Sequence, residues 1–389
     1  MAQQIIYVAS GDVSVYESQV LELLAYYQKK GVKVFLLQGY MNDNQRNSIE
    51  YKLSKYSIPV YWVKSYSVYP IFQRQAIVQF YHGLIKIPNY KESTIHIRSE
   101  YNGFLFKKLL CKYNLNIPLL IDIRGVVFEE IKYKMGRSMG LRKWLFMIQK
   151  NYLRRCYQFL FSEDYMPICI SSVSNKINEY IQNHYPNCRY KLYFHPNIAG
   201  KHFVYDELKR VSIRAKYGIA ENEVLAICAT GGNSLWQQDF RVIKHLLNLG
   251  IKVINLSRND YDISDCITTT VPFAEMPDML SAADIAVLWR EDDFINQSAS
   301  PSKFSEFASM GLYVIHNGTV QVATDYIQFS NNGCIVKNAG DISVSIIDTV
   351  KQLNRVESIK SGKSAFGVEA IGISYLKCLG FCFFSNSSR

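Results

Sequence analysis

The sequence has few of the features that would place it in a membrane or in an oxidising compartment. Its 389 residues contain no run of about 18 or more apolar residues, so we expect no helix that crosses a bilayer. The opening residues, Met1-Ala2-Gln3-Gln4, lack the charged region of a secretory signal and lead straight into a strand-like segment. The nine cysteines form no C-x-x-C pair, which favours reduced thiols over a disulfide framework or a zinc site. Together these absences predict a cytoplasmic protein.

Several catalytic and binding motifs are also missing. No G-x-G-x-x-G follows the first strand-like segment, so we expect no dinucleotide site there. The spacing of side chains reveals no Ser-His-Asp or Cys-His arrangement for nucleophilic catalysis, and no short-period repeat is evident. No nucleic-acid-binding module is recognisable, so nucleic acid is not an expected partner even though the chain is basic.

The positive charge is concentrated in the first half of the chain. The formal net charge is +11, but residues 1–200 hold 26 Lys and Arg against 13 Asp and Glu, a net of +13. The remaining residues hold 18 against 20, a net of −2. A basic half joined to a nearly neutral half indicates that the partner of the first half is anionic.

Short apolar segments alternate with helical patterns along the chain, as in α/β proteins with parallel sheets. A strand at residues 5–9, a turn containing Gly11 and a helix from about 14 to 30 predict the opening of a Rossmann-like unit. A second such unit begins near Val224, and the length is sufficient for two complete cores. Further strands are predicted at residues 32–37, 59–63, 94–97, 118–123, 169–173, 192–194, 252–256, 268–271 and 284–288, and helical patterns at 71–84, 102–113, 206–216, 340–363 and 365–379.

A strongly basic segment covers residues 131–157, which include eight Lys or Arg and no acidic residue. Leu141, Trp144, Leu145 and Ile148 fall on one helical face of this segment. Such a helix can lie in an anionic membrane interface, which would place the protein peripherally on the inner face of a membrane. Alternatively, it packs on its own sheet and shows a basic face to water.

The segment that organises the sequence runs from residue 299 to 316 and reads A-S-P-S-K-F-S-E-F-A-S-M-G-L-Y-V-I-H. Ser300 is a candidate helix cap and Gly311 suits the left-handed residue that ends a helix. Lys303 and Glu306 lie near the amino end of this helix, where unpaired N–H groups favour an anion. Lys303 would add a charge for phosphate, and Glu306 could accept hydrogen bonds from sugar hydroxyls. The alternative is a capped surface helix with one ordinary i, i+3 ion pair.

This segment resembles the donor-site motif of retaining glycosyltransferases with the GT-B fold, family four, of the type that builds bacterial surface polysaccharides. The resemblance extends to Arg290 and Asn296, which precede the motif, and to a T-G-G-N-S-L-W-Q loop after the first strand of the second unit. It implies two Rossmann-like domains facing across a cleft: an acceptor domain at residues 1–196, a nucleotide-sugar domain at 197–364, and a helix and tail at 365–389 that return to the first domain. The donor-binding residues that it implies are Gly232, Asn233, Ser234, Trp236, Gln237, Asn296, Ser298, Ser300 and Glu306.

The resemblance also implies the chemistry. A sugar would move from a UDP- or GDP-sugar to a hydroxyl of a lipid-linked or polysaccharide acceptor, with retention and with no cofactor. The leaving diphosphate would be stabilised by Arg290 and Lys303 without metal, although Glu291-Asp292-Asp293 offers carboxylates. A catalytically silent scaffold subunit and a sugar-nucleotide epimerase with the same fold remain alternatives.

The chain departs from the family pattern at one position and matches it at another. Where the family commonly has a glutamate eight positions before Glu306, this chain has Ser298, which cannot accept hydrogen bonds as a charged carboxylate does. The D-x-R-G segment formed by Asp122 and Arg124 resembles a feature of the same glycosyltransferases. Arg124 is therefore a third candidate catalytic residue, and Gly11, Arg98 and Asp122 are candidates on the acceptor side. The alternatives are that Asp122 and Arg124 simply bridge each other across a loop and that Gly11 is an ordinary turn glycine.

Overall fold

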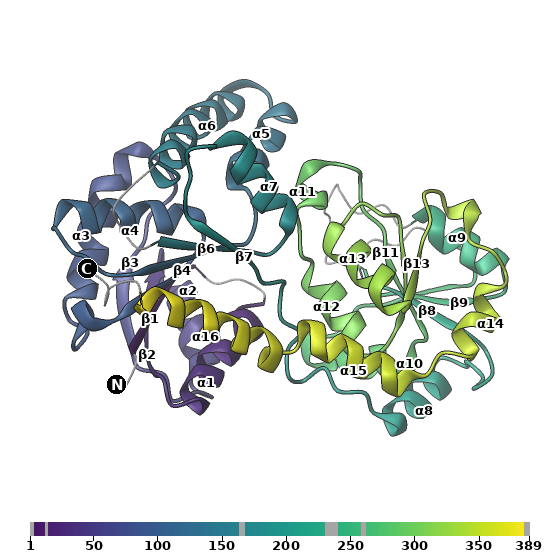
Figure 1. Cartoon of the computed structure of the whole chain (residues 1–389). Coiled ribbons are helices and arrows are strands. Elements are labelled where there is room, and N and C mark those ends of the chain that lie inside the picture. Colours follow the sequence, from purple (N-terminus) through teal and green to yellow (C-terminus); the bar gives the residue numbers. More distant parts are fainter. Residues whose placement is uncertain (1–3, 12–14, 163–167, 230–239, 258–261, 385–389) are drawn as a thin grey trace. The chain divides into compact units, whose positions relative to one another are not determined.

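The structure of the chain is a computed structural model that describes residues 4–11, 15–162, 168–229, 240–257 and 262–384. The chain divides into two compact units (Figure 1). The first comprises Met1–Pro196 together with Ile371–Arg389, and the second comprises Asn197–Ala370. Helix α16, Val368–Phe384, begins in the second unit and continues in the first.

The first unit is built on a sheet of seven parallel strands in the order β3-β2-β1-β4-β5-β6-β7. Its central strands β1, β4 and β5 are almost entirely buried, because helices cover both faces of the sheet. Their side chains are therefore mostly apolar. The strands are β1 (Gln4–Ser10), β2 (Lys33–Tyr40), β3 (Val60–Lys64), β4 (Thr94–Arg98), β5 (Leu119–Ile123), β6 (Ile168–Ser172) and β7 (Lys191–Phe194).

The helices of the first unit connect these parallel strands. A π-helical turn, Glu17–Leu21, leads into α1, and short 3-10 turns at Pro70–Phe72 and Tyr90–Glu92 precede α3 and β4. Helix α16 brings Tyr375 and Ser374 back to the sheet, where both contact His195. The helices are α1 (Glu22–Lys29), α2 (Asp43–Leu53), α3 (Gln73–Leu84), α4 (Glu100–Lys112), α5 (Val127–Gly136), α6 (Gly140–Leu160) and α7 (Asn175–His184).

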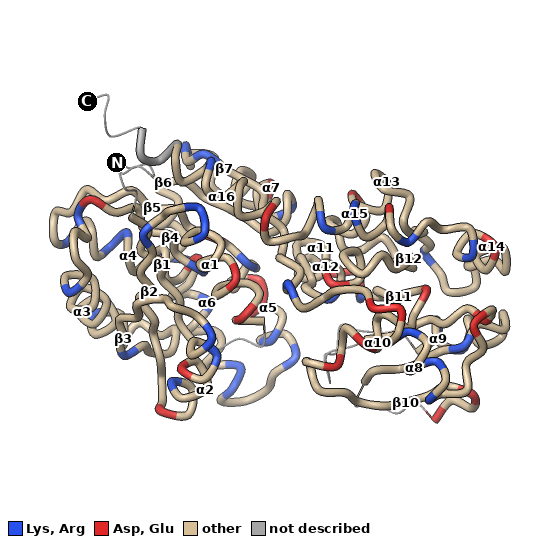
Figure 2. Tube along the Cα trace, turned by 90° about the horizontal axis from the view of Figure 1, so that it is seen from below, with Lys and Arg blue, Asp and Glu red and all other residues tan. Residues whose placement is uncertain are grey.

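Helix α6 is packed at one end only. Its second half is buried through Tyr152, Leu153, Cys156, Tyr157 and Leu160. In its first half the apolar side chains are exposed instead: Leu141 is 73% exposed and Trp144 52%. The alternative in which the whole apolar face packs on the protein's own sheet is therefore wrong for this half. The helix contains several Lys and Arg and no acidic residue. Figure 2 colours the Lys and Arg of the described chain blue and the Asp and Glu red.

The second unit contains a sheet of six parallel strands in the order β10-β9-β8-β11-β12-β13, which confirms the predicted α/β alternation. Two predicted segments differ. The strand expected at residues 268–271 is β10, and it ends at Thr268 before Pro272. The helical pattern at 340–363 is broken by Asn354, whose side chain caps a new helix by accepting from the Glu357 N–H at 3.2 Å. The strands are β8 (Leu225–Cys228), β9 (Lys252–Asn255), β10 (Cys266–Thr268), β11 (Ile285–Leu288), β12 (Tyr313–His316) and β13 (Gly333–Ile335).

Apolar side chains fill both faces of this second sheet. One face is covered partly by α12, whose Phe304, Phe307 and Ala308 are buried, and α12 lies directly against α15. A Cβ at Gly362 of α15 would lie 2.0 Å from the Ala308 carbonyl oxygen, so this contact requires glycine. The helices are α8 (Glu207–Lys216), α9 (Phe240–Asn248), α10 (Met276–Ala282), α11 (Phe294–Gln297), α12 (Ser302–Ser309), α13 (Gln321–Ser330), α14 (Ile346–Lys351) and α15 (Arg355–Phe366), with 3-10 turns at Phe273–Glu275 and Ala339–Asp341.

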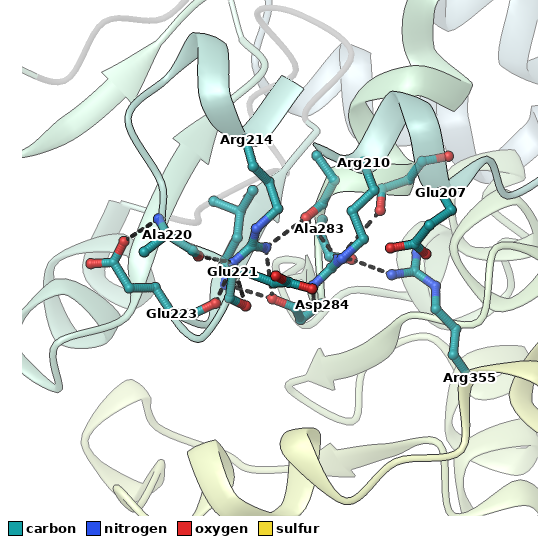
Figure 3. A network of polar contacts seen from close by, with 12 residues as sticks. Glu207, Arg210, Arg214, Ala220, Glu221, Glu223, Ala283, Asp284 and Arg355 are labelled. Carbon is teal, nitrogen blue, oxygen red and sulfur yellow. Dashed lines mark hydrogen bonds and ion pairs between the residues drawn. The ribbon is translucent and has the colours of Figure 1, made fainter. Parts of the chain in front are cut away.

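An arginine network holds the amino edge of the second sheet (Figure 3). Asp284, just before β11, pairs with Arg210 at 2.7 Å and with Arg214 at 3.2 Å, and accepts from the Leu225 N–H at 2.9 Å. Arg355 donates to the carbonyl oxygens of Ala283 and Leu280 nearby. Asp284 is thus engaged by both arginines at the amino edge. In open α/β sheets a ligand site is expected at the opposite, carboxyl edge.

Candidate active site

Helix α12 lies at the carboxyl edge of the second sheet and carries two predicted site residues. It begins at Ser302 and ends at Ser309, and Gly311 adopts the left-handed conformation with φ +71° before β12, as predicted. The predicted cap at Ser300 is wrong, because the Ser300 hydroxyl accepts a hydrogen bond from the Asn197 N–H at 2.9 Å. Pro301 takes the cap position without a side-chain bond, so the amino end of α12 has no side-chain cap.

Lys303 and Glu306 form an ion pair on the first turns of this helix, with 3.2 Å between Nζ and Oε2. The Glu306 side chain is only 3% exposed, whereas that of Lys303 is 21% exposed. Burial raises the pKa of Glu306, and the charge of Lys303 opposes this shift. Within the described residues, Lys303 is the only side chain that pairs with the Glu306 carboxylate, which can accept about four hydrogen bonds.

Arg290 is held at the same edge through its backbone. Its carbonyl oxygen accepts from Nδ2 of Asn317 at 2.5 Å, and its N–H donates to the side-chain Oδ1 of Asn317 at 3.4 Å. His316 ties the end of β12 to the end of β11. Its Nε2 accepts from the Val320 N–H at 3.2 Å. Its Nδ1 therefore carries the proton, which it donates to the Leu288 carbonyl oxygen at 2.9 Å. Burial lowers the pKa of His316 and the charge of Arg290 lowers it further, which keeps the imidazole neutral.

Asn296 and Ser298 occupy the loop between Arg290 and α12. The Asn296 amide donates to the Glu291 carbonyl oxygen at 3.0 Å and to Asp293 at 3.2 Å, so it shapes this loop. The Ser298 hydroxyl is buried and donates to the Ile295 carbonyl oxygen at 3.3 Å. Both side chains lie in the loop that follows β11, and both have local partners. The predicted donor residues Gly232, Asn233, Ser234, Trp236 and Gln237 lie outside the described residues.

The predicted acceptor-side residues meet at the carboxyl edge of the first sheet. Gly11 follows β1 with φ +78°, and its N–H donates to the Gly39 carbonyl oxygen at 3.0 Å. Arg98, at the end of β4, pairs in register with Asp122 of β5. Arg124 closes the group through an ion pair from its Nε to Asp122 Oδ2 at 2.8 Å. Asp122 is fully buried; burial alone would raise its pKa, but Arg124, His96 and Arg98 together hold the pKa below its usual value.

Solved structures share this two-unit architecture, although the sequence matches no family model and no curated protein. A glycosyltransferase from Rickettsia africae aligns with a TM-score of 0.69 at 13% identity, over 98% of each chain. Sucrose-phosphate synthase from Thermosynechococcus elongatus gives 0.63 at 12%, over 98% of this chain and 100% of that one. HepE of Anabaena, solved with UDP, gives 0.65 at 14%, over 97% of this chain and 99% of that one. The chain has the GT-B fold.

In this GT-B fold the acidic run at residues 291–293 serves the loop that contains it. Asp293 caps α11 by accepting from the Asn296 N–H at 2.8 Å, and Asp292 accepts from Gln297 at 2.9 Å. Among the described residues, no three His, Cys, Asp or Glu side chains are grouped so that they could hold a metal ion. Two of the carboxylates that the sequence offered as metal ligands, those of Asp292 and Asp293, are therefore engaged in local hydrogen bonds.

Sequence reasoning missed several residues that organise the two edges of the GT-B fold. In the second unit these are His316, the last residue of the 299–316 segment, and Asn317, which directly follows it. In the first unit His195 contacts the Ser171 hydroxyl at 2.8 Å and the Ser374 hydroxyl at 2.9 Å, and burial lowers its pKa to about 4. Burial likewise lowers the pKa of His96 to about 3. The available signal was the position of each histidine relative to a strand: His96 lies in β4, His316 ends β12 and His195 directly follows β7.

Proposed function

We propose that the protein is a glycosyltransferase that moves a sugar from a UDP- or GDP-sugar to an acceptor hydroxyl. The observation that carries this proposal is the buried carboxylate of Glu306 beside Lys303, at the uncapped amino end of α12. Lys303, the helix N–H groups and Arg290 all place positive charge or donors at one edge of the sheet. A diphosphate requires such a set, and Glu306 would accept from hydroxyl groups of the bound nucleotide or sugar.

The reaction breaks the bond between the anomeric carbon and the diphosphate, so negative charge develops on the leaving oxygen. Lys303 supplies a mobile point charge for it, while the guanidinium of Arg290 can bind two phosphate oxygens at once. The backbone clamp by Asn317 holds the loop of Arg290 in place, so little reorganisation is needed during the reaction. We infer a metal-free reaction with retention, as the motif resemblance implies.

The donor is inferred from the fold and from α12. HepE, which shares the fold, was solved with UDP and with UDP-glucose. At 14% identity this likeness supports a nucleotide-sugar donor and leaves the base open. We therefore propose UDP and GDP as the two nucleotides to test first.

The acceptor is inferred to be lipid-linked or a polysaccharide, with the protein bound peripherally to an anionic membrane through residues 131–157. The exposed Leu141 and Trp144 next to Arg142 and Lys143 support this, since apolar side chains flanked by cations suit a headgroup interface. None of the helices in the described part of the chain has the length and apolar content to span a bilayer.

A thermal-unfolding titration with UDP, GDP and their sugars tests the donor proposal, because a ligand that binds only the native state raises the midpoint. We expect one nucleotide to raise the midpoint of the wild type and to raise that of Lys303→Ala much less. Turnover of the matching nucleotide sugar, followed by release of the nucleoside diphosphate, then separates a transferase from a silent scaffold. If no nucleotide shifts the midpoint, the proposal is wrong.

A further inference from the structure

Arg98 and Arg124 lie at the carboxyl edge of the first sheet, and one donor atom of Arg98 has no partner within the ranges that the structure describes. Arg98 Nη1 is buried and has no hydrogen-bond acceptor in the described part of the chain. Nor does any carboxylate of the described residues lie within ion-pair distance of Arg98. The Arg98 side chain is partly buried and lies beside the Tyr7 hydroxyl, and a guanidinium stays protonated at any physiological pH, so the group keeps its charge. A buried charged donor without an acceptor is costly to the fold, and such groups are found where a ligand completes them.

The groups around Arg98 cannot neutralise it. Asp122, its register partner on β5, is engaged by Arg124 at 2.8 Å, by the Tyr375 hydroxyl at 2.9 Å and by the Ser171 hydroxyl at 3.3 Å. His96 lies in the same strand as Arg98 and is neutral, because burial lowers its pKa to about 3. Positive charge thus exceeds negative charge among these residues.

The nearest glutamate on α4 is also committed elsewhere. Glu100 accepts from the Val127 N–H at 2.8 Å and from the Tyr157 hydroxyl at 2.6 Å. Burial raises its pKa to about 7, so the carboxyl is partly protonated near neutral pH. Among the described residues, no ion pair joins Glu100 to Arg98 or Arg124.

We propose that Arg98 and Arg124 form an oxyanion subsite that binds a phosphate or carboxylate group carried by the acceptor. Two guanidinium groups present planar arrays of donors that match these groups. The Asp122 carboxylate fixes the Nε side of Arg124, and Tyr375 of α16 fixes Asp122 in turn. Binding of an anion at Arg98 and Arg124 does not depend on the transferase reaction. The inference that this anion is part of the acceptor rests on the proposed function.

The test is thermal unfolding with inorganic phosphate in one arm and glucuronate in the other, with chloride added to keep the ionic strength constant. Wild type should show a saturable rise of the midpoint, and the arm with the lower half-saturating concentration identifies the acceptor group as phosphate or carboxylate. Lys303→Ala removes the proposed donor phosphate contact and should keep the rise. Arg98→Met should need at least about tenfold more anion, as expected for loss of charged hydrogen bonds. Arg74→Met, at an exposed arginine of α3, is the matched control and should behave as wild type.

The same variant separates binding from a structural role. If Arg98 serves a ligand, Arg98→Met removes a partly buried charge whose Nη1 has no acceptor, so without anion its midpoint should equal or exceed that of wild type. If Arg98→Met does not fold, Arg98→Lys keeps the charge, loses the planar array and should bind the anion more weakly. The absence of a saturable rise in wild type, or an undiminished rise in the Arg98 variant, overturns the proposal. UDP is titrated in parallel: its failure to bind would refute the donor proposal and leave the anion result standing.

Discussion

The hydroxyl of Tyr375 donates a 2.9 Å hydrogen bond to Oδ1 of Asp122, across 253 positions of sequence. Both side chains are fully buried, and Tyr375 also stacks on His195 with 3.9 Å between ring centroids. Burial raises the pKa of Tyr375 well above its usual value, so the phenol stays protonated and remains a donor. The orientation of Arg124, which pairs with the other oxygen of Asp122, therefore depends on a residue near the end of the chain.

Lys303→Ala should lower kcat/KM by about 10²–10³, equivalent to about 2–4 kcal/mol of transition-state stabilisation, because a phosphate contact is lost. The fold should be retained, since Phe304, Phe307 and Ala308 form the core face of α12. Steady-state kinetics with the nucleotide sugar measure the effect. Lys360→Ala is the matched control, because Lys360 of α15 is also paired i, i+3 with a glutamate but is exposed. Unchanged turnover in folded Lys303→Ala would refute the assignment.

Arg290→Lys should lose most of the activity even though the charge is kept. A lysine cannot bind two phosphate oxygens in one plane, whereas the Asn317 clamp holds only the backbone and survives the change. The loss should appear mainly in kcat, and Arg241→Lys on the exposed surface of α9 should be neutral. Equal activity of Arg290→Lys and wild type would instead indicate a structural role for the residue.

Replacing Arg142 and Lys143 by glutamate should release the protein from anionic vesicles. Each basic residue near such a surface contributes about 1 kcal/mol, so the double reversal should weaken binding at least about tenfold. Trp144→Ala should have a smaller effect, and added salt should weaken binding of the wild type. Co-sedimentation measures this, with Lys86→Glu and Lys91→Glu, two exposed lysines of the same unit, as the charge-matched control. A wild type that does not sediment with vesicles at low salt would remove the membrane from the proposal.

His195→Gln should change how stability depends on pH. Burial lowers the pKa of His195 to about 4 in the fold, against about 6.5 in the unfolded chain. As the pH falls below about 6.5, the unfolded state binds the proton first, so this histidine costs the wild type stability that His195→Gln does not lose. Between pH 7 and 4.5 the free energy of unfolding should shift in favour of the variant by about 2–3 kcal/mol. Urea unfolding at several pH values measures this shift, and parallel curves for the two proteins would contradict it.

Periodicity and turn residues were sufficient to predict much of the fold. Most strands of the two sheets, the core face of α12 and its end at Gly311 follow from local patterns of apolar residues and glycine, but β13 was not predicted and β10 was predicted two residues too late. Local patterns failed where the partner is distant in sequence. Ser300 has the right residue type and position for a cap, but its hydroxyl is taken by Asn197, 103 positions away.

The same limit applies to the candidate sites. Spacing placed Lys303 and Glu306 on one helix, and α/β topology placed Arg98 and Asp122 at one sheet edge. Spacing could not reveal that Asn317 clamps Arg290, or that Tyr375 and His195 lie beside Asp122, because these contacts exist only once strands and helices have assembled. The sequence could not predict that Trp144 is exposed either, since an amphipathic pattern predicts an apolar helix face but not what packs against it.

The division of the chain sets the order in which its parts can be completed on the ribosome. The second unit is one continuous stretch, Asn197–Ala370, inserted into the first. The sheet of the first unit is synthesised earlier, yet Asp122 and His195 obtain Tyr375 and Ser374 only when α16 emerges. Until then the Asp122 carboxylate and the His195 imidazole of a nascent chain lack the hydrogen-bond partners that α16 supplies. The unit that is translated first is therefore the one that matures last.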